Sequence, residues 1–260
     1  MEKKKMMHVG ISAGDIGGYV LLPSSPERAE ALSHFLDDVQ QVAWFREYRT
    51  FTGFLEGERV SITSTGMGGP SMTIAVEELH ECGAHTVIRV GTCTSASAKV
   101  HTCDVVLPNG AVRMEGVADH YAHPEYPAVP DMDVLASLED AAKAQGRTYH
   151  VGIDITKACF STQYDAEERP WGRDLKARWD AYEAGGALSA DMGCAPMFIA
   201  ASAQNVRAGA VLAVTCERGQ RPIYRCDVPA ACEQITCETA VEGLRRLIRE
   251  DRSRGAACEN

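Results

Sequence analysis

The sequence predicts one α/β domain built of three layers, with helices on both faces of a central sheet. Short β-branched runs alternate along the chain with segments whose apolar residues recur at helical spacing. The segment from Val60 to Thr94 shows this alternation most clearly, because it contains a strand, a glycine-rich turn, a helix and a second strand. With 260 residues and no linker or internal repeat, the chain can form one large core.

A strand at 19–22 opens the core, and a helix follows it directly. A serine supplies the N-cap, Pro26 occupies the first helical position and Glu27 lies in the first turn. Arg28 follows one turn into the helix, so a strand end, a helix N-terminus and an arginine meet there. This combination suits an anion, although a capped helix with a solvated arginine is the more common interpretation of the feature alone.

The rest of the chain divides into elements at regular intervals. A polar stretch at 161–171 is interpreted as a lid or specificity loop, because it joins a strand to a helix. We expect residues 1–7 to be a flexible N-terminus, 8–249 the folded domain and 250–260 a disordered tail. The other strands are expected at 44–54, 59–64, 86–90, 104–107, 151–156, 187–192 and 210–216, and the other helices at 71–80, 134–145, 175–184, 195–205 and from Pro229 onward.

Composition excludes several classes of function. The formal charge of −10 argues against a nucleic-acid-binding surface. The chain contains no run of 18 apolar residues, so we expect no membrane span. The basic N-terminus lacks the apolar stretch of a signal peptide, which favours the cytoplasm. Ten cysteines occur at irregular spacing without a CxxC pair, so we expect reduced thiols and no zinc.

One arginine stands where α/β folds bind ligands. Arg89 lies near the end of a short buried strand and is followed by Gly91 and Thr92. Ligands of open α/β sheets bind at the carboxyl ends of strands, and an arginine with a glycine and a hydroxyl suits phosphate. From this stretch alone, a surface arginine that closes a strand is an equally good interpretation.

Five motifs carry a resemblance to a known family. HVGI, LLPSSPERAE, FREY, STGMGGPS and RVGTCT occur in an order that resembles the uridine phosphorylases of the nucleoside phosphorylase-I family, from about His8 to Leu247. The resemblance implies a mixed sheet flanked by helices, and dimers that share active-site residues and usually form hexamers. It also implies phosphorolysis of a nucleoside to a free base and ribose 1-phosphate, with phosphate as co-substrate and no organic cofactor.

The resemblance also implies roles for individual residues. Those of the phosphate site are Ser24, Arg28, Arg89, Thr92 and, from the partner subunit, Arg46. Those of the ribose site are Thr92, Asp191, Met192 and, from the partner, His8. Those of the base site are Phe160, Gln163, Asp165 and Arg218. Arg28, Arg89 and Asp191 are the expected catalytic residues, and Glu47, Met67 and Ser71 match a site for a monovalent cation, potassium, at the dimer interface.

The chain departs from the family pattern at three places. Ser24 and Ser25 replace the Gly-Asp of the phosphate loop, and Asp165 stands where the uracil motif has an arginine. Asp191-Met192-Gly193 replaces Glu-Met-Glu, so a carboxylate that holds the sugar is missing, and we expect Gly193→Glu to raise turnover of uridine. The preferred function is phosphorolysis of a pyrimidine nucleoside such as uridine. The alternatives are a catalytically weakened binding protein or partner subunit, and a hydrolytic nucleosidase, against which the arginines count.

Overall fold

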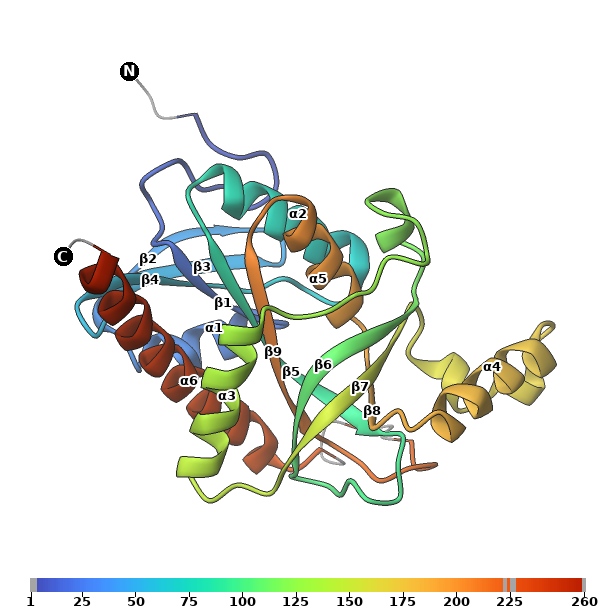
Figure 1. Ribbon diagram of the computed structural model, residues 1–260. Helices are drawn as coiled ribbons and strands as arrows, with labels where there is room; N and C mark the ends of the chain where they lie inside the picture. The colour runs from blue at the N-terminus through green and yellow to red at the C-terminus, as the bar shows by residue number, and fades with distance from the viewer. Residues whose placement is uncertain (1–3, 222–223, 225–227, 259–260) are drawn as a thin grey trace.

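The computed structural model describes residues 4–221, 224 and 228–258. Among these residues, nine strands form one mixed sheet in the order β2-β3-β4-β1-β5-β8-β7-β6-β9 (Figure 1). The strands are β1 (Tyr19–Pro23), β2 (Asp37–Phe45), β3 (Tyr48–Leu55), β4 (Glu58–Thr63), β5 (Thr86–Ser95), β6 (Val105–Met114), β7 (Tyr149–Lys157), β8 (Ser189–Asp191) and β9 (Arg207–Val214).

The long strand β5 joins two parts of the sheet. It pairs in parallel with β1 on one side and with β9 on the other, and its last residues pair antiparallel with β8. Because β9 pairs with β6, β6 with β7 and β7 with β8, these five strands close into a ring. Strands β1 to β4 extend from β5 as an open sheet. The mixed sheet confirms the predicted fold class, and the closed ring places the second half of β5 next to β7 and β8.

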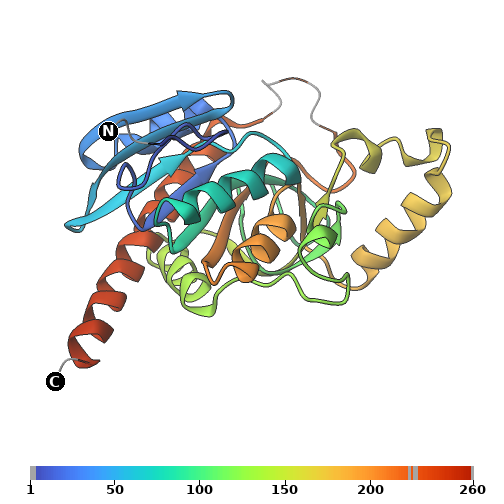
Figure 2. The same cartoon turned by 90° about the horizontal axis from the view of Figure 1, so that it is seen from above.

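Helices cover both faces of the sheet (Figure 2). On one face, α2 (Gly69–Glu81) packs against α5 (Cys194–Ala203), and their buried side chains join one apolar core. On the other face, α1 (Pro26–Ser33), α3 (Met132–Ala144) and α6 (Ala230–Cys258) enclose a second core. Helix α4 (Gly172–Ala184) projects from the side of the domain together with the short turns η2 (Ser161–Gln163) and η3 (Ala166–Glu168). The predicted three layers are therefore present.

Strand β2 was not predicted. The segment 44–54, expected to be one strand, is a hairpin in which β2 pairs antiparallel with β3 around a turn at Arg46 and Glu47. Most of β2 is exposed, and its polar and apolar residues occur in blocks, so it lacks the alternation that reveals a strand in sequence. Strand β2 is one edge of the sheet, and its turn carries Arg46 with a φ of 55°.

The expectation of a disordered tail from residue 250 is wrong for the described residues. Helix α6 continues to Cys258, and its last turns are held by charges on other elements. Asp251 accepts a hydrogen bond from Tyr19 Oη at 2.7 Å and pairs with Arg207, and Arg252 pairs with Glu58 at 3.0 Å. These long-range ion pairs supply the order that the polar local sequence does not indicate.

The ends of the chain are only partly described. Residues 1–3 and 259–260, parts of the expected flexible termini, lie outside the described residues. Met6 is described, and its backbone N–H donates to the carbonyl of Ile11 at 2.6 Å. Among the described helices, each is too short or too polar to cross a membrane.

Candidate active site

A cavity of about 130 Å³ lies where β5, β7 and β8 meet, beside the first turn of α2. Several residues expected in the phosphate, ribose, base and cation sites line it together: Ser24, Met67, Arg89, Thr92, Phe160, Asp191 and Met192. The structure adds residues that were not predicted: Gly68, Cys93, Thr94, Lys157, Ala190 and Thr215. The cavity is therefore the candidate active site.

The N-terminus of α2 forms one end of the cavity. Gly68 is the N-cap, with a φ of 96°, and it lines the cavity next to Met67. This left-handed backbone favours glycine, and a glycine offers no side chain to cap the first N–H groups of the helix. A helix N-terminus without a side-chain cap attracts an anion through its N–H groups and its dipole. The glycine-rich turn therefore has the conformation that the sequence suggested.

Arg89 lies at the centre of the site and is almost fully buried. Its Nε donates to Oδ2 of Asp191 at 2.7 Å, and only 8% of its side chain is exposed. Within the part of the chain that is described, no protein group accepts a hydrogen bond from Nη1 or Nη2 of this guanidinium. Asp191 therefore fixes the plane of the arginine and leaves two donors for a ligand in the cavity.

Two glycines leave room for this guanidinium. A β-carbon on Gly193 would lie 3.0 Å from Cζ of Arg89, and one on Gly91 would lie 3.2 Å from the same atom. Either contact is tighter than ordinary packing and requires the arginine to move by a few tenths of an ångström. A side chain at position 193 therefore crowds Arg89, which is a cost that the expectation of higher turnover in Gly193→Glu does not include.

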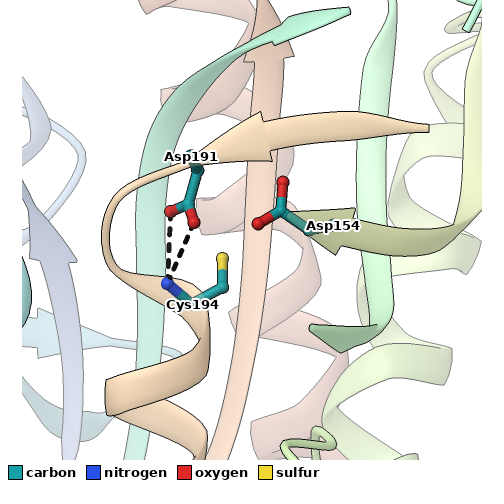
Figure 3. Close-up of side chains that lie close together, drawn as sticks. All are labelled: Asp154, Asp191 and Cys194. Atoms are coloured by element: carbon teal, nitrogen blue, oxygen red, sulfur yellow. Dashed lines mark hydrogen bonds between the residues drawn. The ribbon is translucent and has the colours of Figure 1, made fainter. Parts of the chain in front are cut away.

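Asp191 is fully buried and belongs to a polar cluster with Asp154 and Cys194 (Figure 3). Its carboxylate accepts hydrogen bonds from the backbone N–H groups of Gly193, at 3.0 Å, and Cys194, at 3.2 Å. Thr156 Oγ1 donates to Asp191 at 3.0 Å. Donors of the protein, including Arg89, thus surround the carboxylate that was expected to hold the sugar.

The two buried carboxyl groups differ in their pKa values. Burial and the nearby charge of Asp191 raise the pKa of Asp154 well above its usual value. Burial alone would also raise the pKa of Asp191, but the charge of Arg89 and the hydrogen bonds lower it below the usual value. Asp154 therefore keeps a proton under conditions in which Asp191 is the ionised partner of Arg89.

The three side chains of this cluster can be compared with a metal site. Their potential ligand atoms lie within 4.8 Å of one another. However, Ser189 Oγ donates to Asp154 at 2.7 Å, and Asp191 is already paired with Arg89. Burial raises the pKa of the Cys194 thiol well above its usual value, which disfavours a thiolate. The cluster is a hydrogen-bond network that supports Arg89.

Lys157, the last residue of β7, lines the cavity beside Phe160 and was not predicted. Only 4% of the residue is exposed, and Nζ donates to the carbonyl of Phe160 at 3.2 Å and to Oε1 of Gln163. Gln163 in turn donates through Nε2 to Thr94 Oγ1 at 3.2 Å. Burial lowers the pKa of Lys157 from its ordinary 10.5 to about 8, against the attraction of Asp154 and Asp191. A lysine directly after the buried run at 151–156 was the available signal in the sequence.

Arg28 is buried but does not line the cavity. Its Nη2 pairs with Glu233 at 3.0 Å, and its Nη1 donates to the carbonyl of Val90 at 3.4 Å. Its Nε is buried and has no hydrogen-bond partner among the described residues. The side chain of Glu233 is half exposed, whereas that of Arg28 is buried. The structure therefore brings Arg28 close to the strand of Arg89 but pairs it with a carboxylate.

Two residues expected at the base site have other partners. Arg218 pairs with Glu183 at the end of α4 and borders a separate surface hollow. Asp165 accepts hydrogen bonds from Arg221 at 2.8 and 3.0 Å and pairs with Arg169. Of the residues expected at the base site, Phe160 lines the cavity. Gln163 contacts Lys157 and Thr94, which also line it.

The residues expected from a partner subunit lie away from this cavity. His8 Nδ1 lies 2.6 Å from a carboxylate oxygen of Glu78, and Arg46 is exposed at the turn between β2 and β3. Their roles in a partner's site stay predictions. Glu47 and Ser71, expected at the cation site, both approach Gly66: a β-carbon there would lie 2.9 Å from Cγ of Glu47 and 3.0 Å from Oγ of Ser71.

Comparison with known proteins agrees with this geometry. The family model described as the phosphorylase superfamily matches residues 19–235. A uridine phosphorylase of Treponema pallidum is 38% identical over 95% of this chain and 96% of its own length, and that of Escherichia coli is 32% identical over 95% and 100%. A guanosine phosphorylase of Halorubrum lacusprofundi is 34% identical over 81% and 83%. The chain therefore belongs to the phosphorylase superfamily and is related over nearly its whole length to uridine phosphorylases.

Proposed function

We propose that this protein cleaves a pyrimidine nucleoside, with uridine as the first candidate, by phosphorolysis. Phosphate attacks C1′ of the sugar, the C1′–N1 bond breaks, and its electron pair leaves with the base. The products are the free base, which takes a proton from water, and pentose 1-phosphate. The protein would thus be a pentosyltransferase of nucleoside salvage. The relatives named uridine phosphorylases support the substrate class.

The observation that carries the proposal is the orientation of Arg89 by Asp191. The Nε–Asp191 bond leaves both Nη groups for an anion, and Thr92, Ser24 and the N-terminus of α2 line the same cavity. Because these donors are fixed before phosphate arrives, they can hold the nucleophile under C1′ without reorganisation. A hydrolase would have no use for such an anion site.

The assignment of Asp191 differs from the one that the sequence suggested. Its carboxylate is surrounded by donors of the protein, so we assign it to the positioning of Arg89 instead of to the ribose hydroxyls. Thr92 and Met192 remain candidates for contact with the sugar, and Phe160 for contact with the base, since all three line the cavity. The orphan Nε of Arg28 supports its role as a further phosphate ligand once Glu233 has moved away.

We also propose that the protein is a homo-oligomer built of dimers, and that a second copy contributes Arg46 and His8. Strand β2 is an open edge, and large apolar side chains on and near it are exposed. They are Val39, Trp44, Phe45, Phe54 and Met67. Exposed apolar area of this kind is typical of an interface, and Arg46 lies directly beside it.

The expected potassium site fits the oxygen atoms near Gly66. The absence of a side chain there keeps a space between Glu47 and Ser71, and the backbone carbonyl of Met67 is one residue away. Carboxylate, hydroxyl and carbonyl oxygens suit a hard cation, so bound potassium would neutralise Glu47 at the proposed interface. We further propose the cytoplasm as the location of the protein, because ten cysteines at irregular spacing without a CxxC pair are typical of a reducing compartment.

The test is release of free base from a panel of nucleosides with and without phosphate. The panel contains uridine, thymidine, cytidine, guanosine and inosine, because one relative is named a guanosine phosphorylase. We expect release of base from uridine or thymidine that depends on phosphate. Release at the same rate without phosphate would indicate a hydrolase, and no release from a folded protein would indicate a binding protein or partner subunit.

A further inference from the structure

The buried ammonium of Lys157 contacts uncharged groups among the residues that the structure describes. Two of the three N–H groups of its ammonium are taken by the carbonyl of Phe160 and by Oε1 of Gln163. The nearby carboxylate of Asp191 is the ion-pair partner of Arg89. Among the described residues, no salt bridge includes Lys157. A buried ammonium without an ionic partner destabilises the folded state, so the position calls for a reason other than stability.

The surroundings of Lys157 are those of a site for a flat ring. Nζ lies 5.1 Å from the ring centre of Phe160 and 5.1 Å from that of Tyr164. Lys157, Phe160 and Arg89 all line the same cavity. One N–H group of the ammonium therefore remains for a ligand in a cavity that also holds an aromatic ring and the expected anion site.

We propose that Lys157 is a catalytic residue that binds a carbonyl oxygen of the nucleobase and stabilises the negative charge of the departing base. This inference rests on the proposed phosphorolysis. As the C1′–N1 bond breaks, its electron pair spreads from N1 onto the carbonyl oxygens of the pyrimidine ring. The ammonium donates a hydrogen bond to one of these oxygens and keeps its proton. A preorganised cation in a site shielded from water stabilises this charge more in the transition state than in the bound nucleoside.

The hydrogen-bonding capacity of the ammonium group also indicates which class of base the site accepts. An ammonium group only donates hydrogen bonds, so it selects a ring edge that carries an acceptor. Uracil and thymine present two carbonyl oxygens, whereas the amino group of cytosine replaces one of them with a donor. Gln163 helps to hold the ammonium in place, because its carbonyl oxygen accepts from Lys157 and its amide nitrogen donates to Thr94. Nucleosides of 2,4-dioxopyrimidines are thus the expected substrates.

The test compares two leaving groups in the wild-type protein and in Lys157→Met. 5-Fluorouracil is a more stable anion than uracil, so 5-fluorouridine needs less help to lose its base. We expect Lys157→Met to lower kcat/KM for uridine about 100-fold or more, and to lower it much less for 5-fluorouridine. Lys157→Arg should recover part of the loss with uridine. Lys143→Met, which removes an exposed lysine on α3, is the matched control and should change neither value.

Other outcomes would overturn the proposal at different levels. An equal loss of kcat/KM for both substrates would mean that Lys157 only shapes the site. The melting temperature of Lys157→Met should stay the same or rise, because a buried charge is removed; if this variant does not fold, Lys157→Gln serves for the same comparison. If the wild-type protein itself cleaves neither substrate with phosphate, the proposed function fails, and the role of Lys157 fails with it.

Discussion

Nε of Arg89 and Oδ2 of Asp191 are 2.7 Å apart, and both side chains are shielded from solvent. Asp154, directly beside this pair, has a raised pKa, whereas that of Asp191 is lowered. A single negative charge therefore balances the guanidinium. This arrangement explains how an arginine can be buried at the centre of a cavity and still present two donors to a ligand.

The first prediction separates the two carboxyl groups. Asp191→Asn removes the partner of a buried charge, so it should lower the free energy of unfolding by roughly 3–5 kcal/mol. Asp154→Asn is the matched control and should cost much less, because an amide resembles the protonated carboxyl group that is already present. Urea unfolding at one fixed protein concentration measures both variants. Equal losses would contradict the assignment of the charge to Asp191.

The second prediction concerns the space beside Arg89. Gly193→Ala places a methyl group 3.0 Å from Cζ of Arg89, so it should raise the KM for phosphate severalfold while the protein stays folded. Gly193→Glu should lower activity further. Gly255→Ala, at a helical glycine with no neighbouring atom within 4 Å, is the control and should leave the KM for phosphate unchanged. A gain of activity in Gly193→Glu would instead restore the idea of a missing ribose ligand.

The third prediction is a pH dependence. Lys157 has a pKa of about 8, lowered chiefly by burial, so its charged form is present below pH 8 and is lost as the pH rises through that value. Besides Asp154 and Asp191, Cys216 and Cys159 act on this pKa, and Gln163 and Phe160 contact the ammonium directly. The kcat/KM for uridine should therefore fall above about pH 8.

The control for this prediction is Lys157→Arg, whose guanidinium stays charged over the same range. Ionisation of uridine itself affects both proteins equally, so the ratio of their kcat/KM values isolates the lysine. A ratio that does not change between pH 7 and pH 9.5 would show that the titration of Lys157 does not govern the reaction.

The fourth prediction tests whether Arg46 acts in a partner's site. Arg46→Ala and Arg89→Ala should each lower kcat/KM by about 100-fold or more, because each removes a charge from the phosphate site. If Arg46 reaches across an interface, mixed oligomers of the two variants contain some sites with both arginines. Co-expressed chains should then regain activity that neither variant has alone. Activity that stays at the level of the single variants would place Arg46 outside the partner's site.

The local features of the fold could be predicted from the sequence because they depend on neighbouring residues. The helix after Pro26, the turn at Gly66–Gly69 and the strand that carries Arg89 each have their cap, glycine or apolar run within a few positions. Strand β2 lacks such a signal because most of it is exposed. The last turns of α6 were missed because their order comes from pairs with Arg207 and Glu58, far away in the chain.

Several residues of the candidate site could be predicted from the sequence, but the ion pairs that they form could not. Arg89 and Asp191 are 102 positions apart, so nothing local shows that the carboxylate serves the arginine and not the sugar. Arg28 pairs with Glu233, which lies 205 positions away, for the same reason. Lys157 was not predicted because a lysine at a strand end is usually solvated. Its burial depends on the packing around the end of β7, where it contacts Phe160.

The most direct measurement of the central claim is the fate of phosphate during cleavage of uridine. Phosphorus NMR of a reaction that contains uridine and inorganic phosphate distinguishes free phosphate from a sugar phosphate. Our prediction is that ribose 1-phosphate forms in the same amount as uracil and that Arg89→Ala suppresses both. Release of uracil together with free ribose, while inorganic phosphate stays unchanged, would contradict it.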